Sequence, residues 1–237
     1  MMLTIPSDIL MWEAVATVQI AQAMGVPVRC DESMTSLCSY AGLQVGQGEG
    51  IELAYGRAYK KVDSDTQPYV YVLAKESGLS LNIQPPKFPG VKPASGKYIV
   101  LCPFALKQEL DLQVGVWRAV VRMLRMYDLP VYLMGGPGEW RDECAFSENE
   151  ILSEEPIETK LSYLAGATLI VGVPNAWLWM ATAWEKKLIY LYPDMMATVR
   201  WFHYSSLNYG RLIYPARGIQ VSAVLAGLRQ MIAAFEE

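Results

Sequence analysis

The sequence lacks the features that mark several common classes of protein. Lys and Arg number 20 against 24 Asp and Glu, and the pI is near 5.2, so there is no strong signal for nucleic-acid binding. No run of about 18 apolar residues is present to span a bilayer, and Asp8 lies where a signal peptide would carry Lys or Arg. We therefore expect a cytoplasmic protein, whose seven Trp and 14 Tyr would suffice for a peripheral membrane contact.

Side chains that bind metals are also scarce. The single histidine, His203, excludes a multi-histidine metal site, and no nearby Ser or Cys pattern suggests a catalytic triad. We interpret His203 as a structural or surface residue. The cysteines are widely spaced and lack CxxC pairs, so we expect reduced, mostly buried thiols at Cys30, Cys38, Cys102 and Cys144.

The chain does hold enough apolar residues, 52% of 237, to build a packed core. From Tyr98 onward, apolar strands alternate with helices, which predicts a doubly wound α/β sheet of parallel strands. The expected strands are 98–102, 130–134, 168–171 and 188–192, with a further short strand near Glu150. The expected helices are 114–127, 139–146, 157–164, 175–184 and 221–237.

The first part of the chain is less regular. A very short strand precedes an alanine-rich helix, which we expect to run from an N-cap at Ser7 or Asp8 to Met24, with Gly25 as its C-cap. A strand at 27–30 and a helix at 67–77 are also expected, with only short elements and loops between them.

A proline-rich segment divides the chain. Residues 79–97 contain four prolines and two glycines and show no apolar period, which is typical of an interdomain linker. The sequence therefore predicts a smaller domain over 1–95 and a larger domain over 96–237.

Two turns that follow strands are the first places to look for a ligand, because open parallel sheets bind ligands outside the carboxyl ends of their strands. One is the turn at 173–176, in the middle of the apolar stretch 161–194. The other is GGPGE at 135–139, whose glycines and following helix start suit a phosphate or a nucleotide. A plain tight turn explains the glycines equally well.

Individual side chains leave alternatives open. At the start of the first helix, Asp8 fits an N-cap more readily than a catalytic carboxylate. Lys107 follows a strand, where a lysine either meets a phosphate or is solvated in a loop. The tryptophans Trp177, Trp179 and Trp184 fit core or interface aromatics, or a stacking platform for a base or a sugar.

The order of these pieces resembles the lipopolysaccharide heptosyltransferases. PVYLMGGPGE at 130–139 and ETKLSYLAGATLIVGVPNAWLWMATAWEKKLIYLYPD at 158–194 are similar to that family's GGPxE and ADLVVGNDSGPMHLAAALGTPVVALFGPT segments. At the N-terminus, PSDILMWEAVATVQIAQAM at 6–24 is similar to their GDVLxTTPxLxxLK opening. The segment 67–91 is similar to the one that precedes their linker, although no motif is intact.

The resemblance implies a GT-B fold, with two Rossmann-like domains that contain parallel sheets. A reduced N-terminal domain would hold the acceptor and the C-terminal domain a nucleotide-sugar donor, which is a substrate, so that neither a metal nor a cofactor is needed. Position by position, Asp8 matches the family's catalytic base and Lys107 a phosphate-binding lysine. The family's donor loop falls on Gly135, Gly136, Pro137, Gly138 and Glu139.

The sequence departs from the family at the second turn. The family's Asp-Ser-Gly-x-x-His motif falls on Pro174, Asn175, Ala176 and Trp179, so its acid and its histidine are replaced. We still assign these four residues to the donor site. The resemblance implies a metal-independent glycosyltransferase that moves a sugar to a saccharide or another hydroxyl acceptor. Two alternatives stay open: a catalytically inactive nucleotide- or sugar-nucleotide-binding protein of the same fold, and an interaction subunit that docks through exposed Trp and Tyr.

Overall fold

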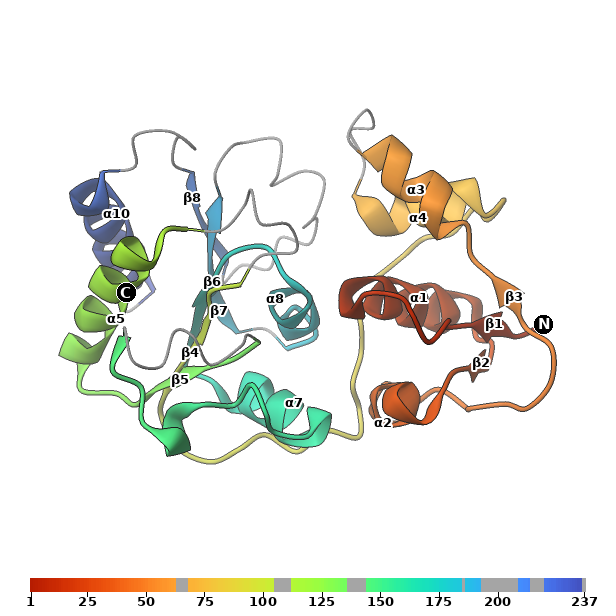
Figure 1. The fold of residues 1–237 in the computed structure, drawn as a ribbon, viewed down its shortest axis with the longest axis horizontal. Helices are drawn as coiled ribbons and strands as arrows, with labels where there is room; N and C mark the ends of the chain where they lie inside the picture. The colour runs from red at the N-terminus through yellow and green to blue at the C-terminus, as the bar shows by residue number, and fades with distance from the viewer. Residues whose placement is uncertain are drawn as a thin grey trace. The chain divides into compact units, whose positions relative to one another are not determined.

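The structure is a computed structural model that describes residues 1–62, 68–104, 112–135, 144–184, 186–192, 209–213 and 220–235. These residues form two compact units, the first running from Met1 to Val91 and the second beginning at Lys92 (Figure 1). Each unit contains its own parallel sheet with helices packed against it, as expected for two Rossmann-like halves. None of the described helices is both long and apolar enough to cross a membrane.

The first unit has a small sheet in the order β2-β1-β3, with both neighbouring pairs parallel. Its strands are β1 (Leu3–Thr4), β2 (Val28–Arg29) and β3 (Ile51–Glu52). Its helices are α1 (Met11–Met24), α2 (Glu32–Tyr40), α3 (Tyr55–Val62) and α4 (Tyr69–Glu76). Helix α1 is apolar on nearly all sides and is correspondingly buried over most of its length, because sheet and helices surround it.

The second unit has a five-stranded parallel sheet in the order β5-β4-β6-β7-β8. The strands are β4 (Ile99–Cys102), β5 (Val131–Leu133), β6 (Leu169–Gly172), β7 (Lys187–Tyr192) and β8 (Tyr209–Ile213). The helices are α5 (Val114–Leu124), α7 (Ile157–Gly166), α8 (Ala176–Ala181) and α10 (Val221–Ala234). Figure 1 shows α5 and α10 on one face of this sheet and α7 and α8 on the other, which is the doubly wound arrangement.

The main core of the second unit lies between the sheet and the pair α5 and α10. Trp117 of α5 is completely buried there, against strand residues such as Leu101 and Leu133. The amphipathic period of α5 places these apolar side chains on one stripe, so burying that stripe stabilises the helix. On the opposite face, the rings of Tyr98, Tyr132 and Tyr163 form an edge-to-face cluster with centroids 4.8–5.4 Å apart.

The proline-rich segment is not a free linker over its whole length. Gln19 Nε2 donates to Gln84 O at 2.8 Å, and Gly90 N donates to Tyr40 O at 3.4 Å, which fixes the first part of the segment to the first unit. Farther on, Ala94 N donates to Ser162 O at 2.9 Å, within the second unit. The backbone that belongs to neither unit is therefore much shorter than the composition predicts.

Several sequence predictions need correction. Neither Ser7 nor Asp8 caps the first helix, whose N-cap is Leu10; no side chain caps the helix N–H groups, and Glu13 in the first turn instead accepts from the backbone N–H of Leu10 itself. Residues 148–150 form a 3-10 turn, and the expected strand reduces to a single bridge between Ile151 and Leu133.

The predictions also omitted one strand, and part of one helix cannot be compared. Strand β8, over Tyr209–Ile213, was not predicted. Most of the expected helix at 139–146 lies outside the described residues. Among the described cysteines all four thiols are free and three are buried, as predicted.

Candidate functional site

The turn between β1 and α1 carries the acidic residue that the sequence singled out. Strand β1 ends at Thr4, and residues 7–9 form an exposed turn before α1 begins at Met11. Asp8 lies on this turn with its side chain exposed, at the carboxyl end of the central strand of the first sheet. The carboxylate is therefore in the position where doubly wound sheets usually meet a ligand.

A second carboxylate lies directly behind Asp8 and fixes the turn. Glu13 Oε2 accepts from Leu10 N at 3.0 Å while Glu13 N donates to Leu10 O at 2.9 Å, so the two residues hold the helix start reciprocally. Burial raises the pKa of Glu13, and the negative charge of Asp8 adds to the increase. The hydrogen bonds from Leu10 and from Tyr69 Oη, the latter at 3.4 Å, act in the opposite direction.

Hydroxyl groups continue this network below the turn. Thr17 Oγ1 and Tyr55 Oη lie 2.6 Å apart, both out of contact with solvent. Burial raises the pKa of Tyr55 to about 12, which keeps its phenol neutral at physiological pH. Beside them, the rings of Trp12 and Tyr69 meet edge to face with centroids 4.3 Å apart. The turn that carries Asp8 is thus backed by buried, hydrogen-bonded side chains.

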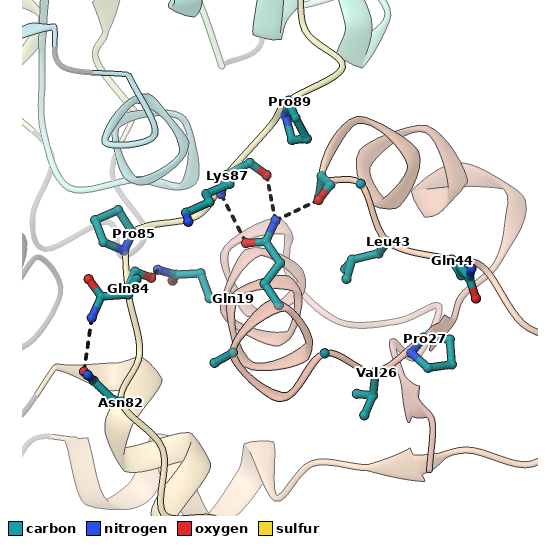
Figure 2. Close-up of a pocket in the computed structure, with 15 residues that line it drawn as sticks. Gln19, Val26, Pro27, Leu43, Gln44, Asn82, Gln84, Pro85, Lys87 and Pro89 are labelled. Atoms are coloured by element: carbon teal, nitrogen blue, oxygen red, sulfur yellow. Dashed lines mark hydrogen bonds between the residues drawn. The ribbon is translucent and has the colours of Figure 1, made fainter.

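A pocket of about 600 Å³ lies at the opposite end of α1. Figure 2 shows the extended segment with Gln84 and Lys87 running past the end of α1 that carries Gln19. Gln22 holds this segment: its Nε2 donates to Lys87 O at 2.7 Å and to Ala41 O at 2.8 Å, and its Oε1 accepts from Lys87 N at 3.1 Å. The carboxamides here hold the backbone together, and the pocket contains no part of the Asp8 turn.

The second candidate region is the carboxyl edge of the five-stranded sheet. In chain order its strands are arranged 2-1-3-4-5, so the direction of winding reverses between β4 and β6. Ligands in open α/β sheets bind at this switch point, outside the carboxyl ends of the two strands. Here those ends are Cys102 and Gly172, which are paired in register.

The side chain of Asn175 closes this switch point. Its Nδ2 donates to Cys102 O at 3.2 Å and to Phe104 O at 3.0 Å, and its Oδ1 accepts from Leu178 N at 2.9 Å as the N-cap of α8. Both ends of the amide are therefore engaged with backbone atoms, and the residue is only 5% exposed. Asn175 holds the end of β6 to the end of β4 and starts the helix.

Trp177 reaches across the same edge. It follows β6 in the chain, yet a Cβ on Gly135, just beyond β5, would clash with Cδ1 and Nε1 of its indole. In the sheet β4 lies between β5 and β6, so the indole reaches from the helix that follows β6 to the turn after β5. Gly135 has φ 87°, a conformation that favours glycine, so the missing side chain serves both the turn and the close approach of the indole.

A lysine on α7 supports this indole. Lys160 Nζ lies 5.0 Å from the centroid of the Trp177 ring and donates to Ser153 O at 2.5 Å. Burial lowers the pKa of Lys160, while the nearby charges of Glu154 and Glu155 oppose that change. No carboxylate of the described residues forms an ion pair with its ammonium group.

No protein-family model matches the chain, and no curated protein matches it significantly. Solved structures do match. E. coli ADP-heptose lipopolysaccharide heptosyltransferase II aligns at a TM-score of 0.60 with 14% identity, over 100% of this chain and 99% of that one.

Two further structures agree. E. coli heptosyltransferase WaaC, solved with ADP-2-deoxy-2-fluoro heptose, aligns at a TM-score of 0.62 with 14% identity over 99% of both chains. A family 9 glycosyl transferase from Veillonella parvula aligns at 0.63 with 10% identity, over 98% of this chain and 97% of that one. The fold is GT-B.

Within this GT-B fold the expected site residues fall into three groups. Asp8 is exposed on its turn, and Gly135 lies under Trp177. The residues of the second turn are all buried, and Trp179 is only 2% exposed. The site residues that lie outside the described residues are Lys107, Gly136, Pro137, Gly138 and Glu139, and His203, which we interpreted as a structural or surface residue, lies outside them too.

Sequence reasoning overlooked two residues of the candidate site. Glu13 stands five positions after Asp8 and is the single charged residue of α1, and this isolation is a signal that could have been used. Lys160 lacks such a signal, because its position at the sheet edge depends on how α7 packs. For Trp177 a stacking role was one of the alternatives, but its proximity to Gly135 was not foreseeable.

Proposed function

We propose that the protein is a glycosyltransferase that moves a sugar from a nucleoside-diphosphate-sugar donor to a hydroxyl group of an acceptor. The observation that carries the proposal is the full-length fold match to glycosyltransferases, which spans both units. Fold alone does not establish an activity. Two features of this chain also support the proposal. Asp8 is exposed in the turn after β1, and the second sheet has the strand order 2-1-3-4-5, whose switch point binds nucleotides in other proteins.

In this proposal Asp8 is the general base. The acceptor oxygen attacks the anomeric carbon, and the carboxylate of Asp8 takes the hydroxyl proton as the new bond forms. The bond between the anomeric carbon and the diphosphate oxygen breaks, and the nucleoside diphosphate leaves with the electron pair. Glu13 holds the turn on which Asp8 stands, so it is a positioning residue.

The donor side of the proposal rests on the second unit. We assign donor contacts to Lys107, to Gly135 and to the loop 136–139, and to the backbone of the turn formed by Pro174, Asn175 and Ala176. Asn175 and Trp179 are buried and would shape this turn from within. Neither a metal ion nor a cofactor takes part in the proposed reaction, and the acceptor is a saccharide or another hydroxyl compound.

A donor panel tests the proposal. The purified protein is incubated with ADP-, GDP-, UDP- and CDP-sugars, with and without a panel of saccharide acceptors, and the released nucleoside diphosphate is measured by chromatography. We expect release from one donor class, stimulated by an acceptor and unchanged by EDTA. Tight donor binding without any release would instead identify a binding protein of the same fold, and the absence of both would overturn the proposal.

A further inference from the structure

We propose that the indole of Trp177 is the platform on which the nucleobase of the donor stacks, an inference that rests on the proposed function. The first observation is its place in the sheet. The ring reaches from the turn after β6 to Gly135 after β5, and these two strands flank β4 in the sheet. This is the switch point, where a doubly wound sheet binds its ligand. The side chain that follows the turn therefore covers the ligand position itself.

The second observation is how little of this ring the protein uses. Trp177 is half-buried, and Lys160 Nζ occupies one side at 5.0 Å from the ring centroid. Trp12 packs against Tyr69, whereas no ring among the described residues packs against Trp177. A partly exposed aromatic face at a ligand edge, without an aromatic partner, suits a planar base.

The third observation concerns the polar edge of the ring. The Nε1 atom of Trp177 makes no hydrogen bond to any described residue, and it faces the Gly135 turn. An indole N–H is a donor only, so it suits an acceptor oxygen on the ribose that is attached to the base. Trp177 thus combines a half-buried ring that has no aromatic partner with an N–H group beside the Gly135 turn.

Lys160 is the positioning residue for this platform. Its ammonium group binds Ser153 O and lies over the indole, so it fixes the ring against rotation from the side that faces α7. Because the side chain is half-buried and held by a carbonyl, it supports the ring from behind. In this account the base stacks on the face that is turned away from Lys160.

Calorimetry on the full-length protein tests this inference. ADP, GDP, UDP and CDP are titrated first, and the tightest nucleotide is then compared with its nucleoside and with inorganic pyrophosphate. We expect Trp177→Ala to weaken the nucleotide and the nucleoside by a similar factor, about 5- to 150-fold, since base stacking has that strength. Pyrophosphate affinity should not change, because it has no base.

Three further variants separate stacking from general damage. Trp177→Phe keeps a ring and should retain most of the affinity. Gly135→Ala changes the turn after β5 and leaves Trp177 itself unchanged. The added methyl group should displace the indole and so weaken nucleoside binding, and thermal unfolding shows whether the variant is folded. Lys160→Met leaves the indole in place but loosens it. We therefore expect a smaller loss of affinity than in Trp177→Ala, equal for the nucleotide and the nucleoside. A loss restricted to the nucleotide would overturn the supporting role and assign Lys160 to the phosphates.

The possible failures are distinguishable. If no nucleotide binds to the wild-type protein, the proposed function fails, and the inference fails with it. If a nucleotide binds and Trp177→Ala binds it equally well, the inference alone is overturned. The same holds if Trp177→Ala weakens pyrophosphate as strongly as the nucleoside, because the ring would then support the site as a whole.

Discussion

The two units each present a turn at the carboxyl end of a central strand, but the two turns are built in opposite ways. In the first unit Asp8 is exposed, and the turn is held by a neighbouring polar group, because Glu13 accepts a hydrogen bond from Leu10 N. In the second unit the only polar side chain of the turn, Asn175, is buried and bonded to three backbone groups. One turn keeps its reactive group available, whereas the other uses its polar group for structure.

This difference indicates where chemistry and recognition reside. An exposed carboxylate can take a proton, while a buried carboxamide with both ends occupied offers a ligand only the shape of its turn. In the proposed function, recognition in the second unit would then come from groups around the turn, among them Trp177, whose indole lies against Gly135. If the proposed function holds, the closed turn would contribute backbone groups and shape to the donor site, and its one polar side chain would not contact the donor.

Substitution of Asn175 should have the largest effect on stability and would break the comparison most directly. Asn175→Ala removes the N-cap of α8 and leaves two carbonyls without their donor, for an expected loss of about 2 to 4 kcal/mol in the free energy of unfolding. Asn175→Ser should recover only the part due to the cap. Chemical denaturation measures both, with the exposed Asn149→Ala as a control expected to lie within about 0.5 kcal/mol of wild type.

A near-neutral Asn175→Ala variant would contradict the closed-turn description. It would show that the amide is not needed to hold β4 and β6 together, and the second turn would then resemble the first.

Gln22 provides an intermediate effect within the first unit. Gln22→Leu removes three hydrogen bonds between α1, Ala41 and Lys87, for an expected loss of about 1 to 2 kcal/mol because water can replace part of them. The backbone amide of Lys87 should exchange hydrogen faster. Gln44→Ala, which lines the same pocket with an exposed side chain, is the matched control. Unchanged exchange at Lys87 would show that this segment is held by other contacts.

Substitution of Glu13 should have the smallest effect on the free energy of unfolding, and this effect should depend on pH in a definite direction. Since burial raises its folded-state pKa above 4.5, the stability that Glu13 contributes is present below that pH and is lost as the pH rises through the folded-state value. The unfolding free energy of wild type should therefore fall relative to that of Glu13→Gln as the pH rises from about 4.5.

The coupling between the two acids can be checked directly. Removing the charge of Asp8 in Asp8→Asn should lower the pKa of Glu13, as followed by carboxyl NMR titration. A pH-independent stability difference and an unchanged titration would together show that the carboxylates do not interact.

The fold was largely predictable from the sequence because the strands of the second unit are continuous apolar runs separated by helical periods, as at Ile99–Cys102 and Leu169–Gly172. Strand β8 was missed because YGRLI, over Tyr209–Ile213, mixes glycine and arginine with apolar residues. The helix start after Leu10 was missed because this helix has no side-chain cap, so a polar residue such as Ser7 or Asp8 does not mark its beginning.

The candidate site was less predictable than the fold. The motif resemblance assigned Asp8 and Gly135 to turns that follow strands, and the structure has Asp8 in the turn after β1 and Gly135 just after β5, while their roles stay predictions. The contacts of Asn175 with Cys102 and Phe104 are separated by more than 70 residues in the chain. Such contacts depend on strand order and register, which local patterns do not contain.

The most direct test of the account is the turnover of Asp8→Asn at saturating donor, with donor binding measured on the same protein. We expect turnover to fall by about 10²- to 10⁴-fold while donor affinity stays within twofold, because the base acts on the acceptor proton and not on the donor. Glu49→Gln, another exposed acid of the first unit, should keep full turnover. Unchanged turnover in Asp8→Asn would contradict the assignment of the open turn to the chemical step.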